Sequence, residues 1–311
     1  EIFERIVTLN IINNPLIKYM TIDYSIEENS KIKEEKSLEA NNPKSNELTT
    51  LRITPNTFDI SCSKQVNFPL IVCSHERSGT HFIMNSISGC TDYISDPFLN
   101  FDYNPIGGLV NFFSEVSVNN FINSLKELKY NDEILCLNNI IKSHFPVSLL
   151  GNNYSGSGKI VYIYRNPIDV FTSYWKFLHR WDWFEGPKVK KPLDLIKSPP
   201  SGQSQRYQIE NQPNYFARWA SHVIDAKMSS QNSSNIILVN YSELLNNFDQ
   251  TVLNICSQLQ IEVKNQPIKP SKNNFIHGKD LTITNKDNKQ IKEFIEKEIN
   301  KYPDLPDDIL S

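Results

Sequence analysis

A polar turn directly after the first long apolar run carries side chains suited to hold an anion. Residues 68–73 read FPLIVC, and a continuous apolar run of this length is typical of a strand buried on both faces, as in a parallel sheet. Arg77, Ser78, Gly79 and Thr80 follow, at the start of a helix-compatible segment. A turn at a helix N-terminus points backbone N–H groups and the positive end of the helix dipole at an anion. The pattern therefore predicts a phosphate-binding turn.

This turn alone leaves its function open. The nucleotide-triphosphate loop pattern Gly-x4-Gly-Lys-Ser/Thr is absent, because no glycine precedes Arg77 at the required spacing. Taken alone, an Arg-Ser-Gly-Thr segment is more typical of an ordinary strand–turn–helix corner with glycine at a tight position. Other groups in the chain must decide between the two interpretations.

A cation and an imidazole stand together at the end of a second apolar run, which spans residues 133–141. Side chains alternate along a strand, so Lys142 and His144 are predicted to point to the same side. Pro146 ends the extended segment. A histidine with its ordinary pKa near ~6.5 can accept a proton near neutral pH, so the pair suits acid–base chemistry. A solvated strand end explains the pair alone equally well.

A third corner repeats the pattern of strand, cation and helix. Residues 159–164 read as a buried strand, and Arg165 follows it. Asn166 and Pro167 then suit the N-cap and the first position of a helix, and Ser173 lies further along that helix. Ligands of open α/β sheets collect at the carboxyl ends of the strands. The corner at Arg165 is therefore predicted to face the same ligand as the first turn.

The alternation of strand-like and helix-like segments predicts a three-layer α/β/α fold with a central parallel sheet, similar to the P-loop NTPases. Another strand is expected at residues 235–239, whereas 91–118 and 185–213 are predicted to be irregular. Apolar residues at helical spacing predict further helices at residues 82–89, 117–129, 214–229, 249–259 and 287–300. Residues 1–50 are predicted to be an N-terminal extension with a flexible linker, and residues 51–311 the catalytic domain.

The composition bounds the class of protein. The chain has 311 residues, is 39% hydrophobic and carries a net charge of −3, which argues against a general nucleic-acid or anionic-membrane binder. Its five cysteines and six histidines show no metal-ligand spacing, and the cysteines are predicted to be buried thiols in a reducing compartment. No segment approaches the ~20 apolar residues of a membrane span, and the first residues lack the pattern of a secretory signal. A soluble, cytoplasmic protein of undetermined oligomeric state is expected.

Four segments, taken in order, resemble the small-molecule sulfotransferases that use 3′-phosphoadenosine-5′-phosphosulfate (PAPS) as donor. They are Arg77-Ser-Gly-Thr after a strand, Lys142-Ser-His-Phe-Pro, Arg165-Asn-Pro-x-Asp-x-x-x-Ser173 and Trp219-x-x-His222-Val223. The resemblance covers residues 66–300 and implies PAPS as co-substrate and 3′,5′-adenosine bisphosphate (PAP) as product. It also implies a small-molecule acceptor and no required metal.

The resemblance further implies a role for each matching residue. His144 would be the general base, with Lys142 and Arg77 steadying the charge that develops during transfer. The residues implied to bind the phosphosulfate are Arg77, Ser78, Gly79, Thr80 and His81. Those implied to contact the adenine are Phe82 and Phe216. Those implied to bind the 3′-phosphate are Arg165, Ser173, Gly278 and Lys279. Arg77 stands where the family usually has a lysine, and His81 where it usually has a threonine.

Three further positions need an interpretation. Glu76 is an acid in an anion-binding turn, and it is expected to turn outward, to pair with Arg77 or to face a cationic acceptor. His222 is expected to be a hydrogen-bonded packing residue rather than a catalytic one. Near the C-terminus, the segment from Phe275 to Asp280 matches the family's Phe-Arg-Lys-Gly segment only at Phe275 and Gly278.

The implied chemistry agrees with the residues, and two alternatives stay open. Sulfuryl transfer resembles phosphoryl transfer, a loose in-line displacement in which positioning and charge stabilisation matter most. Fixed cations and N–H donors can then take the place of Mg²⁺. A nucleotide-dependent kinase on the same fold would need a Lys-Ser/Thr loop ending and a carboxylate for Mg²⁺. A non-catalytic nucleotide-binding module is disfavoured because Lys142 and His144 are both present.

The acceptor pocket is expected to be shaped by residues 91–113 and 176–213. Aromatic side chains in these segments suggest contact with a rigid ring system: Phe98, Phe101, Tyr103, Trp181, Trp183 and Phe184. Acidic side chains there would allow a cationic acceptor such as an alkaloid or guanidinium metabolite: Asp96, Asp102, Asp182 and Glu185.

Overall fold

The computed structural model describes most of the chain beyond the N-terminal extension. The described residues are 49–53, 58–102, 110–130, 133–150, 158–181, 184–271 and 281–311. Gly278 and Lys279, which were predicted to contact the 3′-phosphate, lie outside these residues. The first described strand begins at Thr49, close to the domain boundary that the sequence predicts at residue 51.

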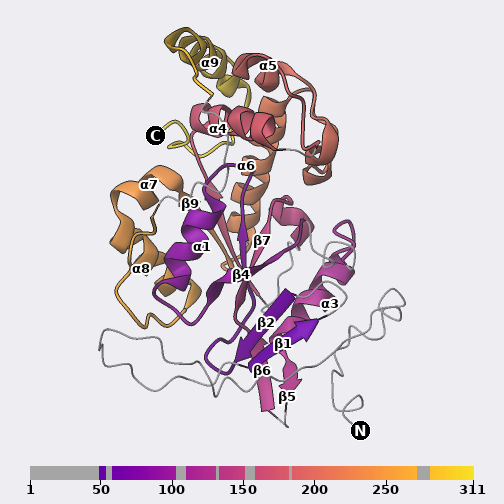
Figure 1. The fold of residues 1–311 in the computed structure, drawn as a ribbon, viewed down its shortest axis with the longest axis vertical. Helices are drawn as coiled ribbons and strands as arrows, with labels where there is room; N and C mark the ends of the chain where they lie inside the picture. The colour runs from indigo at the N-terminus through magenta and orange to yellow at the C-terminus, as the bar shows by residue number, and fades with distance from the viewer. Residues whose placement is uncertain are drawn as a thin grey trace.

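A five-stranded parallel sheet forms the centre of the molecule (Figure 1). Its strands, in spatial order, are β4 (Ile94–Asn100), β7 (Asn139–Ser143), β3 (Leu70–Cys73), β8 (Lys159–Tyr164) and β9 (Ile236–Asn240). All four pairings are parallel, so the carboxyl ends of the strands share one edge. The strand before the predicted phosphate turn is β3, and it occupies the middle of the sheet.

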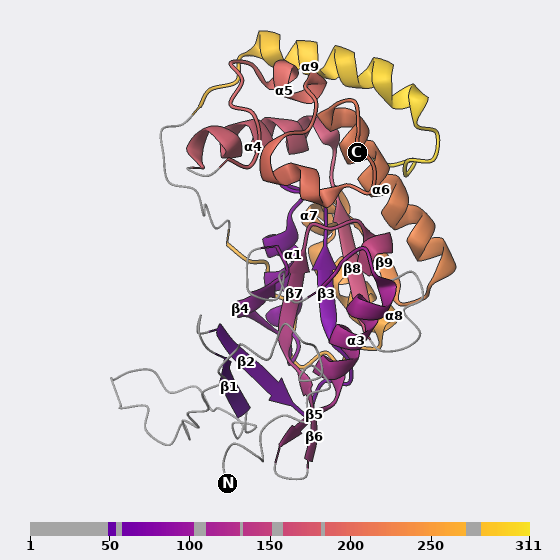
Figure 2. The same ribbon diagram turned by 90° about the vertical axis from the view of Figure 1, so that its right-hand side faces the viewer.

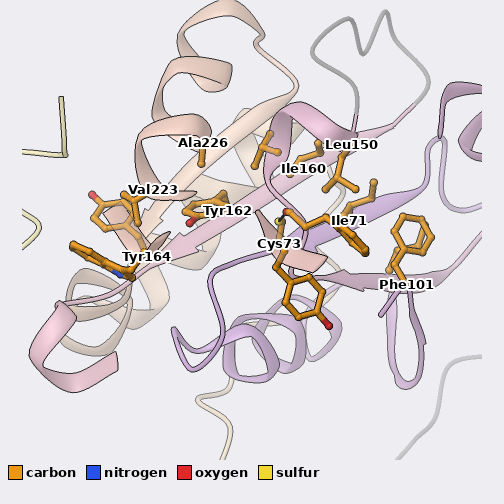
Figure 3. Close-up of a cluster of buried hydrophobic side chains, with 14 of the residues drawn as sticks. Ile71, Cys73, Phe101, Leu150, Ile160, Tyr162, Tyr164, Val223 and Ala226 are labelled. Atoms are coloured by element: carbon orange, nitrogen blue, oxygen red, sulfur yellow. Dashed lines mark hydrogen bonds between the residues drawn. The ribbon is translucent and has the colours of Figure 1, made fainter. Parts of the chain in front are cut away.

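Each face of the sheet builds its own apolar core, because side chains alternate along a strand. Ile71 and Cys73 belong to one core and Leu70 and Val72 to the other. Figure 3 shows the first core around Ile71, Cys73 and Tyr162, with Val223 of helix α6 against it. Helices α3 (Glu115–Lys126) and α6 (Tyr215–Asn232) cover this face, whereas α1 (Thr80–Ser88), α7 (Tyr241–Asn246) and α8 (Phe248–Leu259) cover the opposite one. The three-layer α/β/α prediction is confirmed.

A further group of helices lies beyond the carboxyl edge of the sheet, at the top of Figures 1 and 2. It consists of α4 (Pro167–Arg180), α5 (Pro192–Lys197) and α9 (Asn285–Glu298), with the short 3-10 helices η4 (Gly202–Tyr207) and η5 (Ile299–Lys301). Helix α4 starts where the sequence predicts, because the Asn166 side chain accepts a hydrogen bond from Ile168 N at 3.0 Å and Pro167 opens the first turn. Arg165 therefore stands between β8 and α4.

The predicted single strand at residues 133–141 is wrong, because two strands occupy this region. The first, β6 (Glu133–Leu137), joins a four-stranded antiparallel sheet at the amino end of the parallel one; the remaining strands of that sheet are β1 (Thr49–Ile53), β2 (Phe58–Ser63) and β5 (Leu128–Tyr130). The break falls at the buried Asn138, whose N–H donates to Ser61 O at 2.8 Å. The available sign of the break was the pair Asn138 and Asn139, which interrupts the apolar pattern at this point.

Two segments predicted as irregular also contain regular elements. Residues 91–118 include β4, an edge strand that carries Pro97, and proline is tolerated at sheet edges. Residues 185–213 include α5 and η4. Another 3-10 helix, η3 (Val147–Leu150), follows β7. Within the described ranges, no helix is both long enough and apolar enough to span a bilayer.

Candidate functional site

The turn between β3 and α1 opens a helix at the carboxyl edge of the sheet. Gly79 is the N-cap of α1, with φ at 108°, and its carbonyl accepts hydrogen bonds from Phe82 N and Ile83 N. The Thr80 hydroxyl lies 2.7 Å from the Ser74 hydroxyl. The Ser78 hydroxyl is buried and has no hydrogen-bond partner in the part of the chain that the structure describes. A buried hydroxyl without a partner at a helix N-terminus is suited to an anionic ligand.

Arg77 has an unusual backbone conformation, and its side chain contacts two residues of α4. Its φ of 67° lies in the left-handed region that non-glycine residues rarely adopt. The guanidinium donates from Nε to Ser173 Oγ at 3.1 Å, and it lies 5.2 Å from the centre of the Phe177 ring. Burial, and then the positive charge of Arg165, lower the pKa of Arg77 from its ordinary value. Ser173, which the resemblance groups with Arg165 for the 3′-phosphate, is thus in direct contact with Arg77 instead. The charge of Arg165 acts on Arg77 electrostatically.

Tyr241 connects Arg165 to the turn, and the sequence analysis missed it. Its ring lies 4.4 Å from the Arg165 guanidinium carbon. A Cβ atom placed on Gly79 would be only 2.5 Å from the same ring, so glycine lets the turn approach it. Arg165 is also held by Asp169, whose Oδ2 lies 3.0 Å from Nη2. The available signal was the position of Tyr241 directly after the strand predicted at residues 235–239, which makes it another strand–helix corner.

We expect Gly79→Ala to destabilise the fold by about 1–2 kcal/mol, because an L-residue is strained at this positive φ and its Cβ would displace the Tyr241 ring. Urea unfolding measures the change. Gly89→Ala is the matched control, since Gly89 caps the other end of α1 with φ at −66° and should change stability by less than about 0.5 kcal/mol. Equal stability of the two variants would contradict the role given to Gly79.

Lys142 and His144 share one carboxylate at the end of β7. Lys142 donates from Nζ to Asp102 Oδ2 at 2.9 Å, and the backbone N–H of His144 donates to Asp102 Oδ1 at 3.2 Å. The Lys142 and His144 residues are 5% and 9% exposed, and the Asp102 side chain is fully buried. The strand end is therefore a built, buried charge cluster, not a solvated edge. The two side chains lie on one side of the strand, as predicted.

The hydrogen bonding of His144 fixes which ring nitrogen carries the proton. Nδ1 lies 2.8 Å from the Ser74 carbonyl oxygen, which can only accept, so Nδ1 carries the hydrogen in the neutral ring. Nε2 is then left with its lone pair, 3.9 Å from Asp102 Oδ2. Burial, and then the charge of Lys142, lower the pKa of His144 to about 4, although Asp102 opposes this change. At neutral pH the ring is uncharged and Nε2 can accept a proton.

His81 belongs to the same cluster. Burial lowers its pKa to about 4, with further lowering from Lys142, His144 and Arg77. Its ring meets Phe98 edge-on, with the centres 5.0 Å apart. The structure thus brings the first turn, the end of β7 and the end of β8 to one edge of the sheet.

A family model described as the sulfotransferase domain matches residues 69–302. The chain belongs to the sulfotransferase family. The family predicted from the four sequence segments is therefore confirmed, and the match includes every described corner of the site.

Individual relatives of this sulfotransferase are distant. Sulfotransferase 2A1 of Macaca fascicularis is 30% identical over 122 residues, which is 39% of this chain and 38% of the relative. Cytosolic sulfotransferase 17 of Arabidopsis thaliana is 43% identical over 53 residues, 17% of this chain and 15% of the relative. The chain thus aligns with less than two fifths of the length of these curated relatives. The crystal structure of mouse sulfotransferase SULT7A1 complexed with PAP shows 17% identity and a TM-score of 0.47, covering 76% of this chain and 85% of that one.

The prediction that Phe216 contacts the adenine needs correction. In this sulfotransferase Phe216 is only 1% exposed and packs in the core against Trp219, Phe294 and Tyr302. Its ring therefore has no free surface at the carboxyl edge. Phe82, at the start of α1, has a half-buried ring that meets that of Tyr241 edge-on, with the centres 5.9 Å apart.

The acidic side chains of the sulfotransferase also lie differently from expectation. Glu76 neither turns outward nor pairs with Arg77; it forms an ion pair with Arg218 of α6. Asp102, one of the acids offered for a cationic acceptor, is already engaged by Lys142. Asp96 is exposed, and Asp182 lies outside the described residues.

Proposed function

We propose that this sulfotransferase transfers a sulfuryl group from PAPS to a hydroxyl or amine of a small-molecule acceptor, with His144 as the general base. The observation that carries the proposal is the contact between His144 Nδ1 and the Ser74 carbonyl. It leaves Nε2 as the proton acceptor, in the same cluster as the cationic turn. An oriented neutral imidazole beside an anion-binding turn is what the deprotonation of an acceptor requires.

The residues present fit a doubly phosphorylated donor. The first turn offers a helix N-terminus, the Arg77 guanidinium and the buried Ser78 hydroxyl. The second corner offers Arg165, which lies over the Tyr241 ring. Two cationic corners joined by one aromatic ring suit a ligand with two anionic groups on one ribose and a flat base attached to it.

In the proposed mechanism, PAPS supplies the sulfuryl group when it is bound. Arg77, Ser78 and the N-terminus of α1 hold the leaving phosphate, and Arg165 with Ser173 holds the 3′-phosphate. His144 Nε2 takes the proton of the acceptor. Lys142 offers a cation next to the base, and Asp102 limits the net charge of that pair and holds the His144 backbone.

For the acceptor, we propose a compound with a ring system. The Phe98 ring is partly exposed and lies beside His81, in the cluster that contains His144. The cationic alternative is weakened because Lys142 neutralises Asp102. A screen of phenols, alcohols and amines with labelled PAPS tests the class: selective turnover of neutral phenols would remove the cationic alternative, and selective turnover of amines would restore it.

Calorimetry with PAP and with ATP tests the donor. We expect PAP to bind at least about tenfold more tightly than ATP, because the second cationic corner has a phosphate to hold only in PAP. Tighter binding of ATP would support the kinase alternative. Binding of PAP without any transfer in the acceptor screen would support a non-catalytic nucleotide-binding module.

A further inference from the structure

An ion pair is buried directly behind the anion-binding turn. Nη2 of Arg218 lies 2.6 Å from both carboxylate oxygens of Glu76, and Nη1 lies 3.1 Å from His75 Nε2. Arg218 is 1% exposed and Glu76 is 7% exposed. The turn itself is tied into this group, because His75 Nδ1 lies 3.0 Å from the backbone carbonyl oxygen of Glu76.

Stability alone does not account for such a pair. Removing two charges from water costs about as much as their attraction returns, so a buried ion pair is often no better than apolar side chains of the same volume. Removing only one partner, however, leaves an uncompensated charge. Without Arg218, the Glu76 carboxylate would be unpaired, next in sequence to Arg77, whose guanidinium is proposed to bind the ligand. The acid would then compete with the donor for that cation.

The pair also fixes the chain just before a strained residue. Glu76 precedes Arg77, whose φ of 67° costs on the order of 1 kcal/mol and must be maintained by the surrounding contacts. The hydrogen bonds from Arg218 to the Glu76 side chain hold the turn from the side of α6. The hydrogen bond from Arg77 to Ser173 holds it from the side of α4.

The same face of α6 reaches the base one helical turn further on. His222 lies four residues after Arg218, so the two side chains share a face. Its Nε2 lies 2.9 Å from the His144 carbonyl oxygen, and its Nδ1 lies 2.8 Å from the Tyr162 hydroxyl. Nε2 therefore carries the hydrogen and donates it to the backbone of His144. One helix face thus holds both the donor-side turn and the backbone of the base.

We propose that Arg218 is a positioning residue for donor binding: it neutralises Glu76 and holds the turn in the conformation that presents Arg77 to the anion. This inference rests on the proposed function, since it takes PAP as the probe of the turn. The sequence gives no local sign of it, because Arg218 and Glu76 are 142 residues apart.

The pH dependence of PAP binding separates this role from a merely structural one. Burial raises the pKa of Glu76, but Arg218, followed by His75 and His144, outweighs burial and holds that pKa well below its ordinary value. Glu76 therefore stays charged and paired in the wild type. In Arg218→Met the pKa of Glu76 is released, so the carboxyl can gain a proton in mildly acidic solution. The titratable groups that face Glu76 are Arg218 and His222 of α6, Tyr174 of α4, Tyr162 of β8, His144 after β7, and His75 of the turn.

The experiment is calorimetry with PAP from about pH 5 to about pH 8, on the wild type, Arg218→Met, Arg218→Lys and the double variant Glu76→Gln/Arg218→Met. For Arg218→Met we expect PAP affinity at least about tenfold below the wild type at the upper pH, recovering as the pH falls and Glu76 gains a proton. The double variant, which lacks the acid, should follow the wild-type pH profile within about threefold, because PAP and the histidines titrate alike in both. Arg218→Lys keeps the charge and should show no added pH dependence.

Each outcome has one meaning. Failure of the wild type to bind PAP would refute the proposed function before this inference is reached. PAP binding by the wild type, with Arg218→Met equal to it at every pH, would overturn the role of Arg218 alone. Val252→Ala, a truncation in the buried face of α8, provides a control for lost stability. An equal loss of PAP affinity in Val252→Ala would overturn the inference as well. If Arg218→Met does not fold, Arg218→Gln takes its place in the same pH series. A loss of PAP affinity at the upper pH that recovers as the pH falls supports the role, and an affinity equal to the wild type at every pH overturns it.

Discussion

Replacing His144 by alanine is expected to lower the rate of sulfuryl transfer by about 10²–10⁴-fold, because the transition state loses the proposed general base. The affinity for PAP should stay within about threefold of the wild type, since the cationic turn and Arg165 remain in place. Transfer from labelled PAPS to the best acceptor of the screen gives the rate, and calorimetry gives the affinity.

His179→Ala is the matched control for this variant. His179 is a half-buried histidine on α4 whose Nδ1 lies 2.9 Å from Trp175 O, and it has no contact with the turn or with Asp102 among the hydrogen bonds of the described residues. Its replacement should leave the rate within about threefold of the wild type. A wild-type rate in His144→Ala would show that another group takes the proton.

The pH profile of kcat/KM gives a second test of the role of His144. The base works only when its ring is neutral, and in the free protein the pKa of His144 is lowered to about 4. As the pH falls through this value the ring gains a proton, so the activity that depends on His144 should be full near neutrality and lost below about pH 4. The profile of kcat should break at a higher pH, because the negative donor bound beside the imidazole favours its charged form.

The three strand-end corners of the candidate site could be predicted from the sequence because each is encoded locally. An apolar run ends, a cation or imidazole follows, and a helix or proline signal comes next, as at Arg77, His144 and Arg165. The carboxyl ends of parallel strands share an edge, so three local patterns suffice to bring three side chains together. The parallel topology of the sheet therefore predicts that these side chains are close, although their separation in the sequence does not.

The partners of these corners could not be predicted in this way. Asp102 lies 40 residues from Lys142, and Arg218 lies 142 residues from Glu76. Neither contact leaves a periodic or compositional trace. Phe216 failed for a related reason: helical spacing places a residue on a helix but not on the face that meets the ligand, and this face of α6 packs into the core. The burial of an acid behind a cationic turn is likewise a property of the packed fold, not of the turn's sequence.

Arg77→Met is expected to lower the affinity for PAP by about 10²-fold, because one or two charge-assisted hydrogen bonds to phosphate, each worth about 1.5–3 kcal/mol, are lost. The rate with saturating PAPS should fall as well, since Arg77 is proposed to stabilise the charge on the leaving phosphate. Lys64→Met removes the same charge directly after β2, where the exposed Lys64 pairs with Glu133, and should change neither quantity by more than about twofold. Equal effects of the two variants would mean that Arg77 acts only through the net charge of the protein and does not contact the donor.

Combining Arg77→Met with Ser173→Ala then decides how Ser173 acts. The Ser173 hydroxyl accepts a hydrogen bond from Arg77 Nε at 3.1 Å, so part of its effect on the donor should consist of aiming that guanidinium. In the Arg77→Met background, this contribution of Ser173 to PAP binding is already lost. The losses of PAP affinity should therefore be less than additive, with a coupling of about 0.5–1.5 kcal/mol. Strict additivity would mean that Ser173 reaches the donor without the help of Arg77, and that the two corners of the sheet act on the ligand independently.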